Sequence, residues 1–217
     1  MTKTIGRCLI VACLLILLSG PARAEDRVHV RWVDDGDTIV LIDGRRVRYI
    51  GIDAPEMERH DRPAQPYAHA ARKFNAHLVL SKNVRLEFDR EKTDRYGRLL
   101  AYLFDETGSF VNRTLLAQGL AWVLYRYPND RYHAMLLKTQ QDAMAARKGI
   151  WQNWRETPGR YLGNNRSKRF HLESCPYGSQ TAPRNRIYFS RRWDAFRQGY
   201  APGKRCLKLE NNESLAP

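Results

Sequence analysis

The chain has 217 residues, of which 37 are Lys or Arg and 23 are Asp or Glu, so its formal net charge is +14. This length is enough for one compact domain and a small second module, and it excludes a chain of several full-sized domains. A surface this basic concentrates polyanions, and nucleic acid is the commonest such partner.

Residues 1–24 have the pattern of a secretory signal peptide. Lys3 and Arg7 precede an apolar run over residues 8–18, and Ala-Arg-Ala at residues 22–24 is a small-x-small cleavage site. A membrane-spanning helix needs about 20 residues, more than this run has. An uncleaved segment that anchors the protein in the membrane stays an alternative. We therefore expect a secreted or periplasmic protein with no stable membrane span after cleavage.

From residue 28 to about residue 154 the sequence alternates between strand and helix patterns. Val30 and Trp32 are expected on the buried side of the first strand, and Ser109 is expected to cap the second helix. Strand patterns cover residues 28–32, 38–42, 46–52, 84–88, 99–104 and 121–125, and helix patterns cover residues 66–80, 109–119 and 129–148.

Roughly five short strands forming hairpins, with three interspersed helices, fit a β-barrel with helices of the α+β class. The candidate is a five-stranded OB-type barrel, because closing the sheet removes most edges and leaves one face for a polyanion. A generic α+β domain would give a similar pattern, so the pattern by itself does not identify the fold.

The last 62 residues are separate in composition from the first region. Residues 156–168 are polar, contain Pro and Gly, and are typical of a linker. A small module is expected at residues 169–209, followed by a disordered tail at residues 210–217. Cleavage of the signal peptide leaves Cys175 and Cys206, a pair suited to one disulfide in an oxidising compartment.

Three short stretches contain the residue types that phosphodiester hydrolysis needs, at residues 35–38, 48–56 and 93–98. The reaction needs an activated water and positive charge on the phosphate, and arginine supplies that charge through its bidentate fork. Asp37 and Asp53 could hold a cation together with carbonyl and water oxygens. Ligation by oxygen alone favours Ca²⁺ or Mg²⁺ over zinc.

Each stretch also has an ordinary structural interpretation. Asp35-Gly36 is a common turn pair, an arginine on a strand is usually solvated or salt-bridged, and residues 94–98 could be a charged hairpin tip. The order and spacing of the three stretches together favour a functional site.

In this order the stretches resemble the staphylococcal nuclease family. They read DGDT at residues 35–38, RYIGIDAPE at residues 48–56 and DRYGRLLAY at residues 94–102. Further matches lie at residues 111–112, 118–121, 125 and 149–151. The resemblance covers residues 28–154. It implies a five-stranded OB-fold barrel with three α-helices. It also implies an enzyme that uses Ca²⁺ to cut DNA and leaves 3′-phosphates, and we expect it to cut RNA as well.

The resemblance also implies the metal ligands and the base. Asp37 and Asp53 match the metal carboxylates of the family, and Ala54 stands where a backbone carbonyl binds the metal. Other members can have threonine at that position. Glu56 matches the residue proposed as general base on the attacking water, an assignment that is debated within the family.

The same resemblance implies the residues that contact the nucleic acid. Arg48 and Arg98 match the two arginines that bind the scissile phosphate. Tyr96 and Tyr125 match the tyrosines that contact the nucleotide, and Arg95 and Tyr127 are expected to add contacts beside them. The chain departs from the family's best-known member at residues 57–67, where that enzyme has a lysine-rich loop, so substrate preference does not carry over.

The full set of Asp37, Arg48, Asp53, Glu56 and Arg98 favours a nuclease over a protein that only binds nucleic acid. A non-catalytic OB-fold nucleic-acid-binding protein of the cell envelope is the alternative, but such a binder has no reason to keep both metal carboxylates. We expect a monomeric nuclease, a hydrolase, with DNA and RNA as partners.

Residues 169–209 resemble the small metal-binding module of Ada-type DNA repair proteins, which hold Zn²⁺ with four thiolates. Here Gly203 stands near the end where one cysteine is expected, so His171, Cys175 and Cys206 would make an incomplete zinc site. A disulfide between Cys175 and Cys206 is the favoured alternative in an exported protein.

Overall fold

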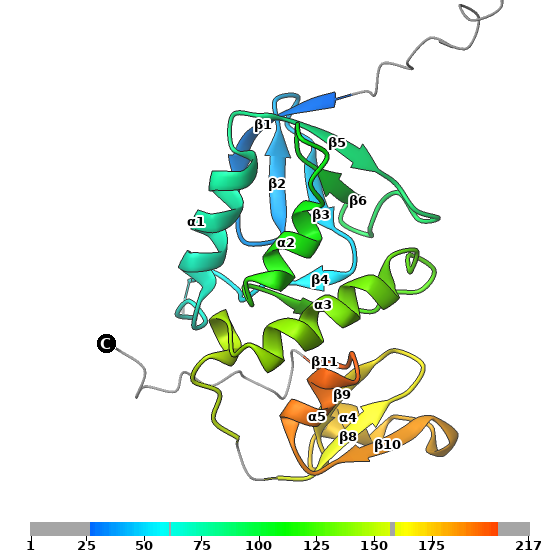
Figure 1. The fold of residues 1–217 in the computed structure, drawn as a ribbon. Helices are drawn as coiled ribbons and strands as arrows, with labels where there is room; N and C mark the ends of the chain where they lie inside the picture. Colours follow the sequence, from blue (N-terminus) through cyan, green and yellow to red (C-terminus); the bar gives the residue numbers. More distant parts are fainter. Residues whose placement is uncertain (1–26, 61, 157–158, 204–217) are drawn as a thin grey trace, which may run out of the picture.

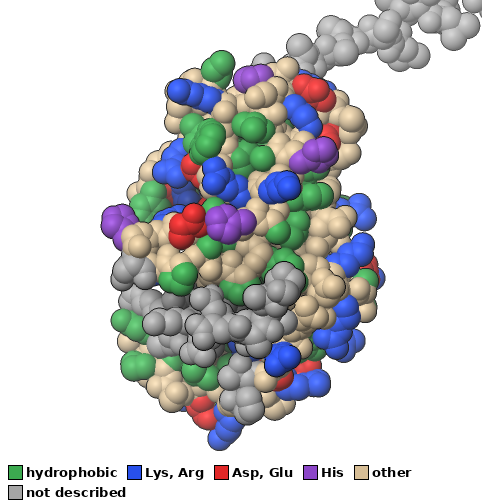
Figure 2. All heavy atoms as spheres, turned by 90° about the vertical axis from the view of Figure 1, so that its left-hand side faces the viewer, with side chains coloured by type: hydrophobic (Ala, Val, Ile, Leu, Met, Phe, Trp, Pro, Cys, Tyr) green, Lys and Arg blue, Asp and Glu red, His purple; other side chains and the backbone are tan. Residues whose placement is uncertain are grey.

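The computed structural model describes residues 27–60, 62–156 and 159–203, which form two units stacked on either side of one long helix (Figure 1). The expected signal peptide, Cys206 and the expected tail lie outside these residues. In the part that the structure describes, no helix is long and apolar enough to span a membrane. On the face that carries helix α1, Lys and Arg side chains are widely spread and acidic ones are fewer (Figure 2).

The first unit is a closed five-stranded barrel with the strand order β1-β2-β3-β6-β5, which confirms the expected barrel. Neighbouring strands pair antiparallel except β3 and β6, which run parallel with Val47 opposite Leu99. The strands are β1 (Arg27–Val33), β2 (Thr38–Leu41), β3 (Arg46–Tyr49), β5 (Asn83–Glu87) and β6 (Leu99–Phe104).

Apolar residues at alternate positions fill the barrel, but the first strand contains an irregularity. The register of β1 against β2 shifts between Val30 and Trp32, so Val33 rather than Trp32 reaches the core. Val33 is 3% exposed and Trp32 is 51% exposed. The guanidinium of Arg72 lies 5.0 Å from the Trp32 ring, a cation–π contact at the surface. The expectation of a buried Trp32 is therefore wrong.

The expected strand over residues 46–52 is broken in two. Gly51 has a φ of +81°, a left-handed conformation that glycine adopts without cost, and it ends the barrel strand. Beyond it β4 (Ile52–Asp53) pairs antiparallel with β7 (Trp122–Val123), outside the barrel. Ile50 packs in a separate cluster with Tyr102, and Ile52 packs in the main core. The break turns Asp53 out of line with the preceding strand.

Three helices cover this unit: α1 (Ala68–Val79), α2 (Val111–Ala117) and α3 (His133–Ala145). The N-cap of α2 is Phe110, not Ser109, whose hydroxyl instead shares a hydrogen bond of 2.8 Å with the Thr107 hydroxyl. Helix α3 begins later than the expected residue 129. The buried Asn129 side chain exchanges two hydrogen bonds of 2.8 Å with the backbone of Glu91, which keeps it in the loop.

The second unit is a four-stranded sheet with the order β10-β8-β9-β11, and we call it the C-terminal module. Residues 161–164 form its strand β8, although the sequence places them in a linker, because Leu162 pairs with His171 and Tyr188. Its elements are β8 (Tyr161–Asn164), β9 (Arg169–Leu172), β10 (Arg186–Phe189), β11 (Ala201–Pro202), α4 (Pro176–Ser179), α5 (Arg192–Arg197) and a 3₁₀ turn at Pro183–Asn185.

A second large hydrophobic core joins the two units. Trp151, in the 3₁₀ turn Gly149–Trp151, is fully buried with its ring 5.2 Å from that of Phe196 in α5. Gln140 in α3 adds polar contacts, accepting a hydrogen bond from the Val123 N–H at 2.6 Å and donating one to the Phe196 carbonyl at 2.5 Å. The members of this core are Trp122, Ala143, Met144, Trp151, Tyr161, Phe170, Phe189, Ala195, Phe196, Tyr200 and Ala201.

Candidate active site

The structure brings two predicted carboxylates and one predicted arginine into a single buried cluster. The Arg48 guanidinium lies between them, with Nη1 2.8 Å from Asp37 Oδ1 and Nη2 2.6 Å from Asp53 Oδ1. Asp37 is 4% exposed and Asp53 is 1% exposed. A buried charge is costly unless it is paired, and here each carboxylate is paired with the Arg48 guanidinium.

Local structure explains how residues distant in sequence meet here. The Asp35 carboxylate accepts the Asp37 N–H at 3.0 Å and shapes the turn before β2. Gly36 within this turn allows a close approach, because a Cβ there would lie 2.6 Å from the Cβ of Ala54. Pairing of β2 with β3 then sets Arg48 opposite Thr38, beside Asp37.

Electrostatics in the cluster favour bound positive charge. Burial raises the pKa of the Asp37 carboxyl well above its ordinary value, against the opposing effect of Arg48. Burial also lowers the pKa of the Arg48 guanidinium, but the carboxylates of Asp37 and Asp53 outweigh it, and the pKa is raised. A further cation beside Asp37 and Asp53 would relieve the same imbalance.

The chemistry of the donors fits a hard cation. Asp37 and Asp53 supply carboxylate oxygens, and the Ala54 N–H donates to Asp37 Oδ2 at 2.5 Å, which places the Ala54 backbone beside them. Within the described residues, no group of three or more His, Cys, Asp or Glu side chains could hold a metal. Carbonyl and water oxygens would therefore complete the shell, and such an all-oxygen set suits Ca²⁺ or Mg²⁺ rather than zinc.

Glu56 lies at the edge of this cluster, on the segment after β4. Its side chain is 38% exposed, and Oε2 lies 3.7 Å from Nη2 of Arg59. Gln65 fixes the backbone, since its side-chain oxygen accepts the Glu56 N–H at 2.8 Å and its own N–H donates to the Glu56 carbonyl at 2.9 Å. Sequence reasoning missed Gln65, because an isolated glutamine in a loop carries no pattern.

Arg98 belongs to a second group, held by Asp94. The Asp94 carboxylate accepts the backbone N–H groups of Tyr96 and Arg98 at 2.9 and 3.0 Å, and the Arg98 Nε at 2.8 Å. Burial raises the pKa of Asp94, but these hydrogen bonds outweigh it, and the pKa is lowered. In the described part of the chain, no ion pair joins Arg98 to Asp37 or Asp53. Asp94 lies in the third motif stretch, but the sequence assigns it no role.

Aromatic side chains lie in the loops around these groups. Tyr96 is 68% exposed, and the guanidinium carbons of Arg95 and Arg98 lie 4.8 and 5.7 Å from its ring. Tyr125 packs edge-on against His133 at 5.0 Å, and Tyr127 is 69% exposed. All the predicted nucleotide contacts are thus in loops with accessible rings or guanidinium groups.

The C-terminal module carries a disulfide rather than a thiolate. Cys175 is disulfide-bonded, and its Sγ lies 3.6 Å from Nδ1 of His171. Because a cysteine binds zinc only as a thiolate, the disulfide-bonded Cys175 cannot be a zinc ligand in this structure. Cys206 lies outside the described residues, so the pairing of Cys175 with Cys206 remains a prediction.

One residue near the cluster was not predicted. Arg169, in β9 of the C-terminal module, places Nη1 4.0 Å from Asp53 Oδ2 and donates a hydrogen bond to the Pro202 carbonyl at 3.0 Å. Burial lowers the pKa of Arg169 and Asp53 opposes this effect. No sequence pattern could reveal the contact, because it depends on how the module docks on the barrel.

Comparison with known proteins agrees with this geometry. Residues 46–153 match the family of staphylococcal nuclease homologues. A thermonuclease of Staphylococcus intermedius is 41% identical over 126 residues, covering 57% of this chain and 74% of the relative. A thermonuclease of Staphylococcus hyicus is 35% identical over 166 residues, covering 69% and 98%. The endonuclease YncB of Bacillus subtilis is 43% identical over 122 residues, covering 54% and 57%. With the barrel, the cluster and these relatives together, the chain belongs to the staphylococcal nuclease family.

Proposed function

We propose that this nuclease is an exported, Ca²⁺-dependent endonuclease that hydrolyses phosphodiester bonds of DNA and RNA and leaves 3′-phosphates. The observation that carries the proposal is the buried cluster of Asp37, Arg48 and Asp53, in which two desolvated carboxylates lie beside an arginine fork. Relatives named as thermonucleases and endonucleases support nuclease activity. The disulfide at Cys175 supports an oxidising compartment outside the cytosol.

The arginines act on the phosphate. Arg48 and Arg98 present planar guanidinium groups that bind two phosphate oxygens at once, and both are held by buried carboxylates before substrate arrives. Such preorganised charge stabilises the extra negative charge of the transition state. Ca²⁺, held by Asp37, Asp53 and the Ala54 carbonyl, would supply further positive charge beside that phosphate.

Glu56 acts on the water. Its partly exposed carboxylate takes a proton from the attacking water as the water oxygen bonds to phosphorus and the bond from phosphorus to the 5′ oxygen breaks. The leaving oxygen then takes a proton from solvent, and the phosphate stays on the 3′ side. Gln65 holds the Glu56 backbone in position for this step.

The test is cleavage of single-stranded DNA and RNA by the chain without residues 1–24, in Ca²⁺ and in EGTA. We expect Glu56→Gln to lower kcat by about 10²–10⁴-fold and Arg98→Lys by about 10²–10³-fold. Glu58→Gln and Arg113→Lys make the same chemical changes at exposed positions and should keep full activity.

Two results would contradict the proposal in different ways. Intact nucleic acid after incubation with the folded protein in Ca²⁺ would overturn the nuclease, and a gel shift without cleavage would favour the binding protein instead. Equal cleavage in Ca²⁺ and EGTA would overturn only the metal dependence. Product ends are read by whether a phosphatase must remove a 3′-phosphate before a polymerase can extend them.

A further inference from the structure

We infer that the C-terminal module extends the active site with a subsite for the sugar-phosphate backbone of a single-stranded nucleic acid. The subsite is a cleft between the loop Tyr125–Tyr127 and the β8–β9 hairpin turn, residues 164–169. The inference rests on the proposed function, because it concerns the strand that continues away from the bond being cut.

The lining of this cleft has the chemistry of a polyanion site. It has a volume of about 750 Å³, and among the described residues its lining includes four cations and no Asp or Glu. One cation, Arg126, comes from the loop of the first unit, and Arg166, Lys168 and Arg169 come from the hairpin. Positive charge in a groove attracts the phosphate backbone without regard to base sequence.

Two of these cations are available to a ligand. Among the described residues, neither Arg166 nor Lys168 forms an ion pair with a carboxylate. The Arg166 side chain is exposed at the tip of the hairpin. Lys168 Nζ donates to Asn165 Oδ1 at 2.6 Å and lies 4.8 Å from the Tyr200 ring. Its charge is therefore positioned but not neutralised.

The hairpin is preorganised by its own hydrogen bonds. The Asn164 side chain accepts the N–H of Arg166 at 3.0 Å, and the Asn164 carbonyl accepts the N–H of Lys168 at 2.8 Å. The Tyr200 hydroxyl donates to Asn165 at 3.0 Å and ties the turn to the module. A fixed turn loses little conformational freedom on binding, which favours affinity.

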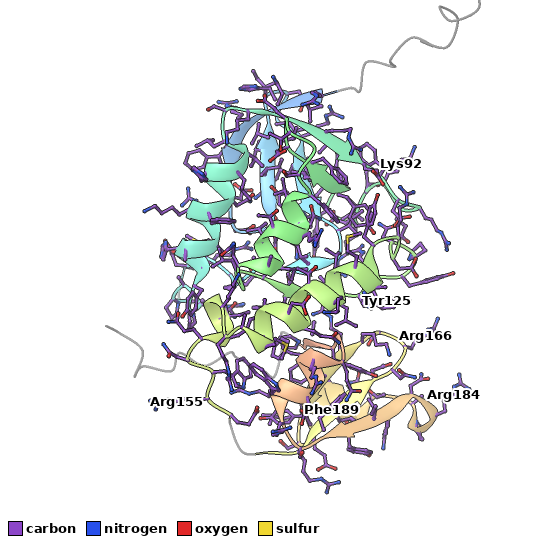
Figure 3. All side chains as sticks on the ribbon, in the orientation of Figure 1. Lys92, Tyr125, Arg155, Arg166, Arg184 and Phe189 are labelled. Atoms are coloured by element: carbon purple, nitrogen blue, oxygen red, sulfur yellow. The ribbon has the colours of Figure 1, made fainter. Side chains whose placement is uncertain are left out.

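The cleft leads directly to the catalytic cluster. Arg169 both lines it and lies 4.0 Å from Asp53. Figure 3 shows Tyr125 on the first unit and Arg166 on the hairpin at the same flank of the boundary between the units. The exposed Tyr127 ring and the neighbouring Tyr125 ring offer surfaces on which bases stack. A strand bound at the cluster would continue between these two walls.

The test measures binding without cutting, by fluorescence anisotropy of a labelled single strand of about 12 nucleotides in EGTA at several salt concentrations. The variant is Arg166→Gln with Lys168→Asn, because Asn tolerates the left-handed φ of +51° at residue 168. We expect the slope of log K against log salt to fall by about 0.7 per lost phosphate contact, about 1.4 in all. Arg155→Gln, an exposed arginine on the opposite flank (Figure 3), is the matched control and should keep the wild-type slope.

Steady-state cleavage in Ca²⁺ gives a second readout. The double variant should raise KM for the strand of about 12 nucleotides and leave kcat unchanged, with no change in either for a strand of about 4 nucleotides. An unchanged salt slope and an unchanged KM for the longer strand would overturn the inference while the nuclease stands. A lower slope with no cleavage even by the wild type would instead overturn the proposed function and keep the subsite.

Discussion

Asp94 shows how one buried carboxylate can organise a catalytic side chain. It ties the turn before β6 to two backbone N–H groups and at the same time pairs with the guanidinium of Arg98. Asp105 makes a similar turn, accepting the N–H groups of Thr107 and Ser109 on one oxygen, but it forms no ion pair with an arginine in the part of the chain that the structure describes. Both residues therefore stabilise a turn, but only Asp94 also positions the Arg98 guanidinium.

We predict that Asp94→Asn lowers kcat about tenfold, because the amide can still accept the backbone N–H groups but no longer holds the Arg98 guanidinium by charge. Asp105→Asn should lose comparable stability and keep its activity. Steady-state cleavage and thermal unfolding of both variants check this. Equal activity in the two variants would show that Arg98 is positioned without Asp94.

The same substitution has a pH signature in stability. The pKa of folded Asp94 is lowered below its unfolded value of about 3.9. Its stabilising effect is therefore fully present above about pH 4 and is lost as the pH falls through the folded pKa. Urea unfolding should show a gap between the wild type and Asp94→Asn near neutral pH that narrows on acidification. A gap that stays constant down to about pH 2 would contradict this assignment.

At the scale of elements, Gln140 is the polar contact that joins α3 to both units. Its amide satisfies the Val123 N–H in β7 and the Phe196 carbonyl in α5, and the side chain is 1% exposed. Its neighbour Gln141 donates to the Arg197 carbonyl at 2.9 Å, but that hydrogen bond is exposed to solvent. The pair allows the buried and exposed versions of one contact to be compared.

We predict that Gln140→Leu lowers the free energy of unfolding by about 1–3 kcal/mol, because it leaves the buried Val123 N–H without its partner. The Phe196 carbonyl keeps the Gly199 N–H at 2.9 Å. Gln141→Leu should change it by no more than about 0.5 kcal/mol, since water can replace the lost bond. Urea unfolding of the two variants measures the difference. Equal losses would mean that water reaches the Gln140 contact.

Elements were predictable where local pattern and tertiary structure agree. Alternation along β5 correctly places Val84 and Leu86 toward the core. The first two motif stretches contain Asp37, Arg48 and Asp53, which the structure brings together. The errors arose where pairing between segments decides. The bulge at Trp32 depends on the register of β1 against the neighbouring β2, and the break at Gly51 and the late start of α3 depend on partners far along the chain.

At the scale of the whole molecule, the site could be predicted only within the first unit. Phe170 and Phe196 of the C-terminal module pack together with Trp122 and Trp151 of the first unit. Docking of the two units follows from this complementarity of shape, which is not visible in either segment alone. Arg169 reaches Asp53 as a result.

We predict that the full chain unfolds in a single cooperative transition, because one core spans both units. A chain that ends at residue 155 should lose stability and aggregate, since Trp151 and Met144 would become exposed apolar surface. Calorimetry and light scattering of both chains test this. Two separate transitions in the full chain, or a stable soluble truncation, would contradict the shared core.

The shared core also sets the order of events during synthesis. A nascent chain emerges from its N-terminus, and domains generally fold as they are completed. Here the barrel is finished long before Phe196, Tyr200 and Ala201 are available to cover Trp151. The enzyme therefore cannot reach its final packing until residues 196–201 have been made. Maturation of the shared core is timed by that segment.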